Sequence, residues 1–104
     1  MNIQFNTDKT INASEKNTAP FMVQIIDELS RFSTDITRIE VHLSDENGNK
    51  DGLNDIRCLL EARLEGKQPI AVTNQADTPD QALSGAIDKL KASLETITGK
   101  GRNY

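Results

Sequence analysis

His42 and Cys58 are the only histidine and the only cysteine of the chain, and these two side-chain types most often carry acid–base or nucleophilic chemistry near neutral pH. A lone histidine forms no zinc site without further His or Cys ligands nearby. His42 falls on the polar side of an alternating segment, so we expect an exposed histidine on a sheet. Cys58 falls on the apolar side of its segment, which predicts a small, buried side chain.

No other catalytic or metal-binding pattern is complete in the sequence. There is no Ser/His/Asp arrangement, no pair of catalytic carboxylates and no glycine-rich phosphate loop. The segment 45–56 begins like a calcium-binding loop, with oxygen ligands at its first, third and fifth positions (Asp45, Asn47 and Asn49). Its sixth position needs glycine but holds Lys50, and its twelfth needs glutamate but holds Ile56. We therefore predict a polar loop over 44–55, no metal, no cofactor and no enzyme activity.

A second set of candidates consists of cations near the C-terminus. Lys89 and Lys91 flank the apolar stripe of the last helical segment, and Lys100 and Arg102 follow that segment. Arg31 ends an earlier helical segment. One interpretation is a ridge that contacts RNA phosphates, which positions a protein without reading bases. The other is an ordinary solvated face with basic residues near the favourable end of a helix.

A third charged set alternates in sign along one predicted strand, at Arg57, Glu61, Arg63 and Glu65. A neighbouring strand should bring Arg38, Glu40 and His42 close to it. Pairing of opposite charges across a solvated sheet explains this pattern without any function. A binding face is the other interpretation, and its mixed signs suit a protein partner better than bare phosphate.

Overall charge and composition restrict the partners further. The chain has 104 residues with 12 basic and 16 acidic side chains, so its net charge is −4, which opposes nucleic-acid binding. Only the stretch 78–104 has more basic than acidic residues. Four aromatic residues and no Trp make a base-stacking platform improbable. A single Cys, with no apolar leader or membrane-length apolar run, favours a cytoplasmic protein without membrane contact.

Periodicity predicts six elements that position these residues. Alternation of polar and apolar residues predicts strands at 2–6, 39–43, 57–65 and 70–73. Apolar spacings of three and four predict two helices. The stripe of the first helix is Phe21, Met22, Ile25, Ile26, Leu29 and Phe32, and that of the second is Leu83, Ala86, Ile87, Leu90, Leu94 and Ile97.

The sequence marks the ends of the second helix more clearly than the start of the first. Thr78 is an N-cap, Pro79 suits the first helical position, and Gly99 is a natural stop. For the first helix, an N-cap at Ser14 would place Pro20 beyond the first turn. We therefore predict an N-cap at Thr18 and regular helix from about Thr18 to Arg31, either alone or after an irregular turn.

The order β-α-β-β-β-α predicts an α+β fold in two layers, in which both helices cover one face of a four-stranded sheet. The first two strands should be parallel neighbours joined by a right-handed crossover. At this length we expect one domain over 1–104, with a flexible tail from 99 to 104.

The stretch 69–94, together with the order of elements, resembles the family of ribosome hibernation-promoting factor and ribosome-associated inhibitor A. Its most specific part is 81–94, where Ala-Ile-Asp-Lys-Leu at 86–90 is similar to the family's second helix. Residues 2–7 and 36–43 resemble its first two strands. The resemblance implies a double-stranded-RNA-binding-type fold that docks on rRNA of the small ribosomal subunit. There it would regulate translation under stress and help store idle ribosomes, as a short form without the extra C-terminal domain.

The chain departs from this family in its basic residues. Lys89 matches a basic position, but Ala92, Glu95 and Thr96 stand where typical members continue with Arg and Lys. The first helix offers only Arg31. We therefore expect an acidic variant with weaker RNA affinity and without DNA sequence specificity. The alternative is a protein-interaction module of the same fold that has lost strong RNA binding and uses the mixed-charge sheet face or the acidic loop 44–55. A weak homodimer through an exposed strand edge is one form of this alternative.

Overall fold

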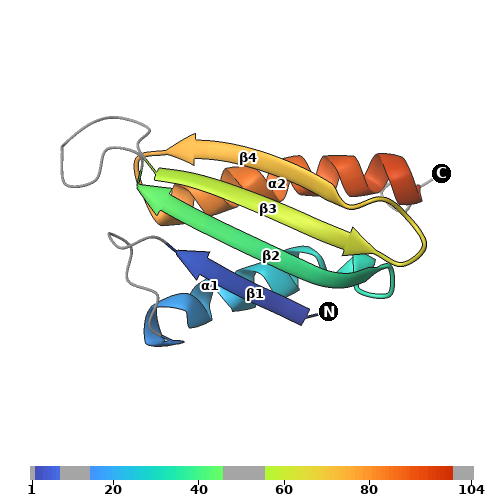
Figure 1. Ribbon diagram of the computed structural model, residues 1–104, viewed down its shortest axis with the longest axis horizontal. Helices are drawn as coiled ribbons and strands as arrows, with labels where there is room; N and C mark the ends of the chain where they lie inside the picture. The colour runs from blue at the N-terminus through green and yellow to red at the C-terminus, as the bar shows by residue number, and fades with distance from the viewer. Residues whose placement is uncertain (1, 8–14, 46–55, 100–104) are drawn as a thin grey trace.

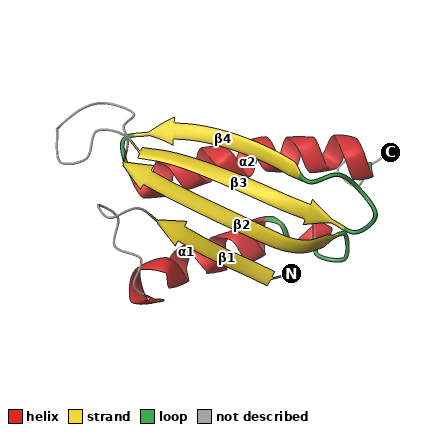
Figure 2. Ribbon diagram, in the orientation of Figure 1, coloured by secondary structure: helices red, strands yellow, loops and turns green. Residues whose placement is uncertain are grey.

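Four strands form a single sheet in the spatial order β1-β2-β3-β4, and two helices lie on one of its faces (Figures 1 and 2). The structure, a computed structural model, describes residues 2–7, 15–45 and 56–99, with side chains from Thr18 onward in the second range. The elements are β1 (Asn2–Thr7), α1 (Glu15–Glu28), the short 3-10 helix η1 (Ser30–Phe32), β2 (Ile36–Asp45), β3 (Ile56–Leu64), β4 (Ile70–Ala76) and α2 (Pro79–Thr98).

The predicted α+β architecture is confirmed, including the pairing of the first two strands. β1 runs parallel to β2, and the other neighbouring pairs are antiparallel. A parallel pair needs a crossover, and α1 supplies it before the chain returns to the sheet. In Figure 1, α1 lies behind β1 and β2 while α2 lies behind β3 and β4. The opposite face of the sheet carries no helix in the described part of the chain.

The core lies between the sheet and the helices and follows the alternation of the strands. The residues of β2 and β3 that point inward are all at most 9 % exposed: Ile36, Ile39, Val41, Leu43, Ile56, Cys58, Leu60, Ala62 and Leu64. The helical layer adds Ile25, Leu29, Phe32, Ala82, Leu83, Ala86, Ile87, Leu90 and Leu94. A one-residue shift of register would expose either strand's apolar set, so burial specifies the register strongly.

α2 begins and ends where its capping residues predict. The Thr78 hydroxyl accepts a hydrogen bond from the Gln81 backbone N–H at 3.2 Å, and Pro79 follows at the first helical position. Gly99 ends the helix at a φ of 75°, a left-handed conformation that glycine adopts without steric cost.

A set of side-chain hydrogen bonds from Asn74, which we call the Asn74 contact, fixes the first turns of α2 against β4. The prediction ended β4 at residue 73, but alternation continues to residue 76 and turns Asn74 toward the helix. Its amide donates to the carbonyl oxygens of Gln81 and Ala82, at 3.4 and 3.2 Å. Gly85 makes this approach feasible, because a Cβ there would lie 2.1 Å from the Asn74 amide nitrogen.

The predicted start of α1 at Thr18 is wrong, since the helix already begins at Glu15. Pro20 therefore stands inside it, where it removes only one hydrogen bond close to the N-terminal end. Thr18 is 7 % exposed and shares the buried side of the helix with Ile25, seven residues further on, and with Leu29, four residues after Ile25. Burial of this stripe outweighs the cost of the proline.

The predicted C-terminal end of the same helix also needs correction. Regular helix stops at Glu28, and residues 30–32 continue as a 3-10 turn in which the Phe32 N–H bonds to the Leu29 carbonyl at 2.9 Å. This tighter turn places the Phe32 ring in the core.

Two residues assigned to the apolar stripes lie at the surface instead. Ile26 is 50 % exposed and Ile97 is 44 % exposed. Both stand at the margin of their stripe, where helical rotation turns the side chain away from the sheet. α2 has many polar residues, and no helix in the described ranges combines the length and apolarity needed to span a membrane.

Candidate functional site

Three polar contacts join the first helix and its 3-10 extension to α2, and we call this set the interhelix seam. Its members are Gln24 with Ser84, Glu28 with Lys91, and Arg31 with Glu95. Lys91 Nζ lies 3.0 Å from Glu28 Oε1, and Gln24 Nε2 lies 2.9 Å from the Ser84 hydroxyl. The partners follow the same order along both segments, which shows that the two helices run in the same direction.

The two ion pairs of the seam lie at the surface. The side chains of Lys91 and Glu28 are 30 % and 42 % exposed, and those of Arg31 and Glu95 are 44 % and 37 % exposed. Exposed pairs of this kind contribute about 0.2–1 kcal/mol each to stability, because water and salt screen them. The Arg31 guanidinium is also held from below, since it lies 4.8 Å from the centre of the Phe32 ring.

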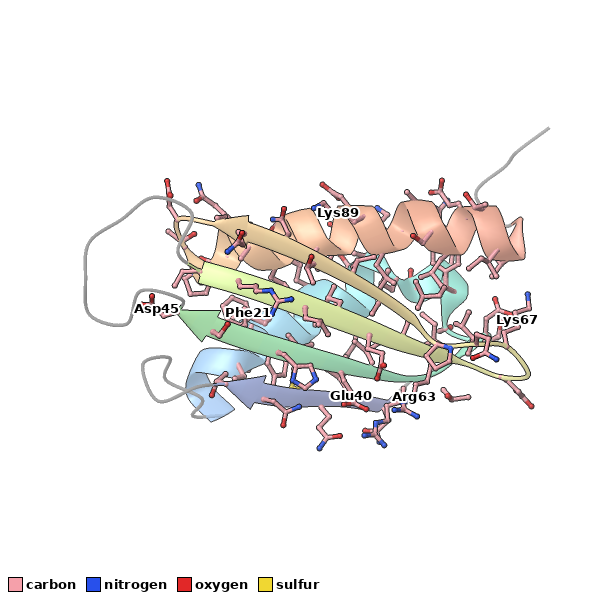
Figure 3. The ribbon with its side chains drawn as sticks, turned by 45° about the horizontal axis from the view of Figure 1, so that its top comes forward. Phe21, Glu40, Asp45, Arg63, Lys67 and Lys89 are labelled. Carbon is pink, nitrogen blue, oxygen red and sulfur yellow. The ribbon has the colours of Figure 1, made fainter. Side chains whose placement is uncertain are left out.

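Lys89 lies on the other flank of α2 from Lys91. Its ammonium donates to the main-chain carbonyl of Thr73 in β4 at 2.8 Å, whereas Lys91 reaches α1. Figure 3 shows Lys89 on the helix beside the sheet. The structure thus brings Arg31 and Lys91 to one seam and separates Lys89 from them by the width of the helix. Lys100 and Arg102 lie outside the described residues.

A second charged region, the Glu40 cluster, occupies the open face of the sheet. Its members are Arg38, Glu40, His42, Glu61 and Arg63. The Glu40 carboxylate lies 2.6 Å from Arg38 and 3.4 Å from Arg63, and His42 Nε2 lies 3.6 Å away. Glu40 is only 14 % exposed because these side chains cover it, and Figure 3 shows Arg63 beside it.

The predicted pairing of charges across neighbouring strands holds for one contact of the cluster, between Arg63 of β3 and Glu40 of β2, whereas Arg38–Glu40 and Arg63–Glu61 pair within a strand. Glu40 and Glu61 stand opposite each other in the register of β2 and β3, as do Arg38 and Arg63. Like charges therefore face each other directly, and the attractive contacts run along a strand or diagonally between the two. Arg38 keeps one buried Nε without a hydrogen-bond partner, so its guanidinium is not fully satisfied.

Neither His42 nor Cys58 lies in a setting that suits catalysis. His42 is exposed on the sheet, as predicted, with its side chain 46 % accessible. Cys58 is buried, also as predicted, and burial raises the pKa of its thiol to about 12. Very little thiolate then exists at neutral pH, and the thiolate is the nucleophile. Within the described ranges no three His, Cys, Asp or Glu residues come together as metal ligands. The calcium-like loop lies outside those ranges, apart from its two ends.

Sequence reasoning identified the cations but missed their partners. Glu28 and Lys91 are 63 residues apart, and Arg31 and Glu95 are 64 apart, so no local spacing signals either pair. One signal did exist, because Glu95 stands at a position where the resemblance leads one to expect a basic residue. An acid at such a position indicates that a nearby cation is being neutralised.

A four-stranded sheet with two helices on one face, and with charged side chains on both surfaces, defines a small two-layer α+β domain. Residues 4–102 match the family described as sigma 54 modulation protein / S30EA ribosomal protein, and the chain belongs to this family. The resemblance drawn from the sequence is thereby confirmed. The family consists of ribosome-associated factors and is not a family of enzymes.

Solved structures share the fold. The N-terminal domain of Protein Y from Thermus thermophilus is 18 % identical, with a TM-score of 0.71, and the match covers 93 % of this chain and 99 % of that one. A ribosomal subunit interface protein from Coxiella burnetii is 17 % identical, with a TM-score of 0.63, covering 95 % of this chain and 99 % of that one. No curated protein matches the sequence.

Proposed function

We propose that this protein docks on the rRNA of the small ribosomal subunit through the basic residues of its helical layer, and so regulates translation and preserves idle ribosomes in the cytoplasm under stress. The observation that carries the proposal is family membership over nearly the whole chain, at residues 4–102. The neighbour named as a ribosomal subunit interface protein has the same fold and agrees with it.

The cations of the helical layer are assigned positional roles. Lys91 and Arg31 lie at the surface of the seam, where a phosphate group can approach them from solvent. Lys89 would contact the RNA backbone on the other flank of α2, and Lys100 and Arg102 are proposed as further phosphate contacts from outside the described residues. Such contacts hold a protein on RNA without base readout and weaken as salt rises.

A charge-reversal experiment tests this proposal. Binding of the purified protein to small ribosomal subunits is measured by co-sedimentation over a range of salt concentrations. We expect release of the unchanged protein as salt rises, and binding weakened about tenfold or more by Lys89→Glu combined with Lys91→Glu. Sucrose-gradient fractionation of stationary-phase cells, probed for this chain, checks the same association in the cell.

The matched control carries the same change in net charge at another place. Arg57→Glu with Lys67→Glu reverses two exposed cations, one on the open sheet face and one in the turn between β3 and β4. This variant should bind much better than the helix variant. Equal losses in both variants would attribute binding to net charge and remove Lys89 and Lys91 from the proposal.

A second candidate function rests on the Glu40 cluster. Its interleaved Arg and Glu side chains present both signs on a face that no described helix covers, which suits a protein surface of complementary pattern. In this alternative the chain acts as a protein-interaction module. Association with purified ribosomal proteins that survives the loss of rRNA would favour it over RNA docking.

A further inference from the structure

We propose that Glu28 and Glu95 limit the affinity of the helical layer for RNA by competing with backbone phosphates for Lys91 and Arg31. The inference rests on the proposed function, and it names two acidic residues as determinants of binding strength. Removing their charge while keeping their shape should turn a weak RNA-binding surface into a stronger one.

The geometry makes each carboxylate a direct competitor of a phosphate oxygen. Glu28 Oε1 occupies a position 3.0 Å from Lys91 Nζ, the distance of a charge-assisted hydrogen bond. Glu95 holds the Arg31 guanidinium in the same way. A phosphate that takes either position must displace the carboxylate or approach beside it, and in the second case it meets a like charge.

The exposure of the seam allows this exchange to occur. All four side chains are 30–44 % exposed, so neither pair is sealed in the core. Exposed pairs are only marginally stable and break and reform readily in water. The ring of Phe32 beneath Arg31 keeps the guanidinium at the surface when its carboxylate partner leaves.

Charge balance in the helical layer leads to the same expectation. Within residues 18–32 and 79–98 there are five carboxylates and three cations. The carboxylates are Asp27, Glu28, Asp80, Asp88 and Glu95, and the cations are Arg31, Lys89 and Lys91. The layer is therefore net negative, although it carries the proposed docking cations. Glu28 and Glu95 are the acids of this set that contact a cation of the layer in the contacts described above.

The test uses Glu28→Gln, Glu95→Gln and the double variant in the full chain, with purified small ribosomal subunits as the probe. Glutamine keeps the length and the acceptor oxygen, so the seam retains a hydrogen bond. We expect each single variant to bind about two- to fivefold tighter and the double variant about tenfold tighter, as expected from the worth of exposed pairs. Each cation that gains a phosphate contact should also steepen the salt dependence by about one unit.

Control variants separate competition from net charge. Glu65→Gln in the turn between β3 and β4 and Asp27→Asn beside Glu28 make the same charge change without releasing a seam cation. Adding Lys91→Ala to Glu28→Gln should abolish the gain of the latter. Thermal unfolding of every variant verifies that the fold is intact.

The outcomes distinguish the inference from the function on which it rests. Binding by the unchanged chain, with no gain in the double variant or with an equal gain in Glu65→Gln, overturns the inference and leaves the proposed function in place. Absence of binding by both the unchanged chain and the double variant overturns both. A gain confined to the seam variants, with a steeper salt dependence, supports the inference.

Discussion

The Glu40 cluster and the interhelix seam contain the same kinds of side chain but arrange them differently. On the sheet, one carboxylate that is 14 % exposed is shared by two arginines and lies near a histidine. In the seam, each cation has its own carboxylate, and all four side chains are at least 30 % exposed. The first arrangement is recessed and shared, and the second is superficial and pairwise.

The difference shows why a count of charges along a sequence does not locate a binding surface. A covered carboxylate that serves several cations cannot leave without exposing mutual repulsion among them, so it is part of the structure. A superficial one-to-one pair loses little when its partner is exchanged. We therefore assign a stabilising role to the Glu40 cluster and a partner-exchanging role to the seam.

The largest expected effect comes from removing the shared carboxylate. Glu40→Gln should lower the free energy of unfolding by about 2 kcal/mol, because Arg38 and Arg63 lose a common partner in a partly desolvated position. Glu28→Gln should lower it by less than about 0.5 kcal/mol. Urea unfolding followed by circular dichroism measures both. Similar values for the two variants would erase the proposed distinction between the regions.

A smaller loss of stability is expected at the Asn74 contact, which fixes α2 and hence the seam. Gly85→Ala should cost about 1 kcal/mol, because the new Cβ would force the Asn74 amide from its hydrogen bonds with the helix. In an Asn74→Ala background the same change should instead stabilise by about 0.5–1 kcal/mol, since alanine favours helix over glycine. A double-mutant cycle of unfolding free energies tests the reversal of sign. The same sign in both backgrounds would contradict the stabilising role of the Asn74 contact.

The smallest effect is expected for RNA docking when the sheet face is altered. Arg38→Gln combined with Arg63→Gln should leave binding to small ribosomal subunits within about twofold of the unchanged protein, since a phosphate surface on the helices does not use them. Co-sedimentation at low salt measures this. A loss larger than that of the Lys89 and Lys91 reversal would move the docking surface to the sheet.

The fold was largely predictable because its signals are local or periodic. Alternation placed Ile39, Val41 and Leu43 in the core, and the chemistry of Thr78 and Gly99 fixed both ends of α2. The start of α1 was not predictable in the same way. Its position depends on burying Thr18 against the rest of the molecule, a tertiary gain that the local penalty of a proline conceals.

The candidate site was predictable in its cations and not in its pairing. Lys91 and Arg31 stand out by type and position, but their carboxylate partners come from the opposite helix across more than sixty residues. Asn74 illustrates the same limit. A polar residue at an inward strand position indicates the end of a strand, unless a glycine on a packed helix makes room for it, as Gly85 of the following helix does.

The hydrogen bond from Lys89 to the Thr73 carbonyl has a consequence for solubility. Among the described strands β4 lies at the edge of the sheet and pairs with β3 alone, and edge strands are templates on which further chains can stack and aggregate. A hydrated ammonium held against the backbone of this strand obstructs such growth. Replacing Lys89 by an uncharged residue would therefore lower the protein concentration at which precipitation begins, whatever the variant does to RNA.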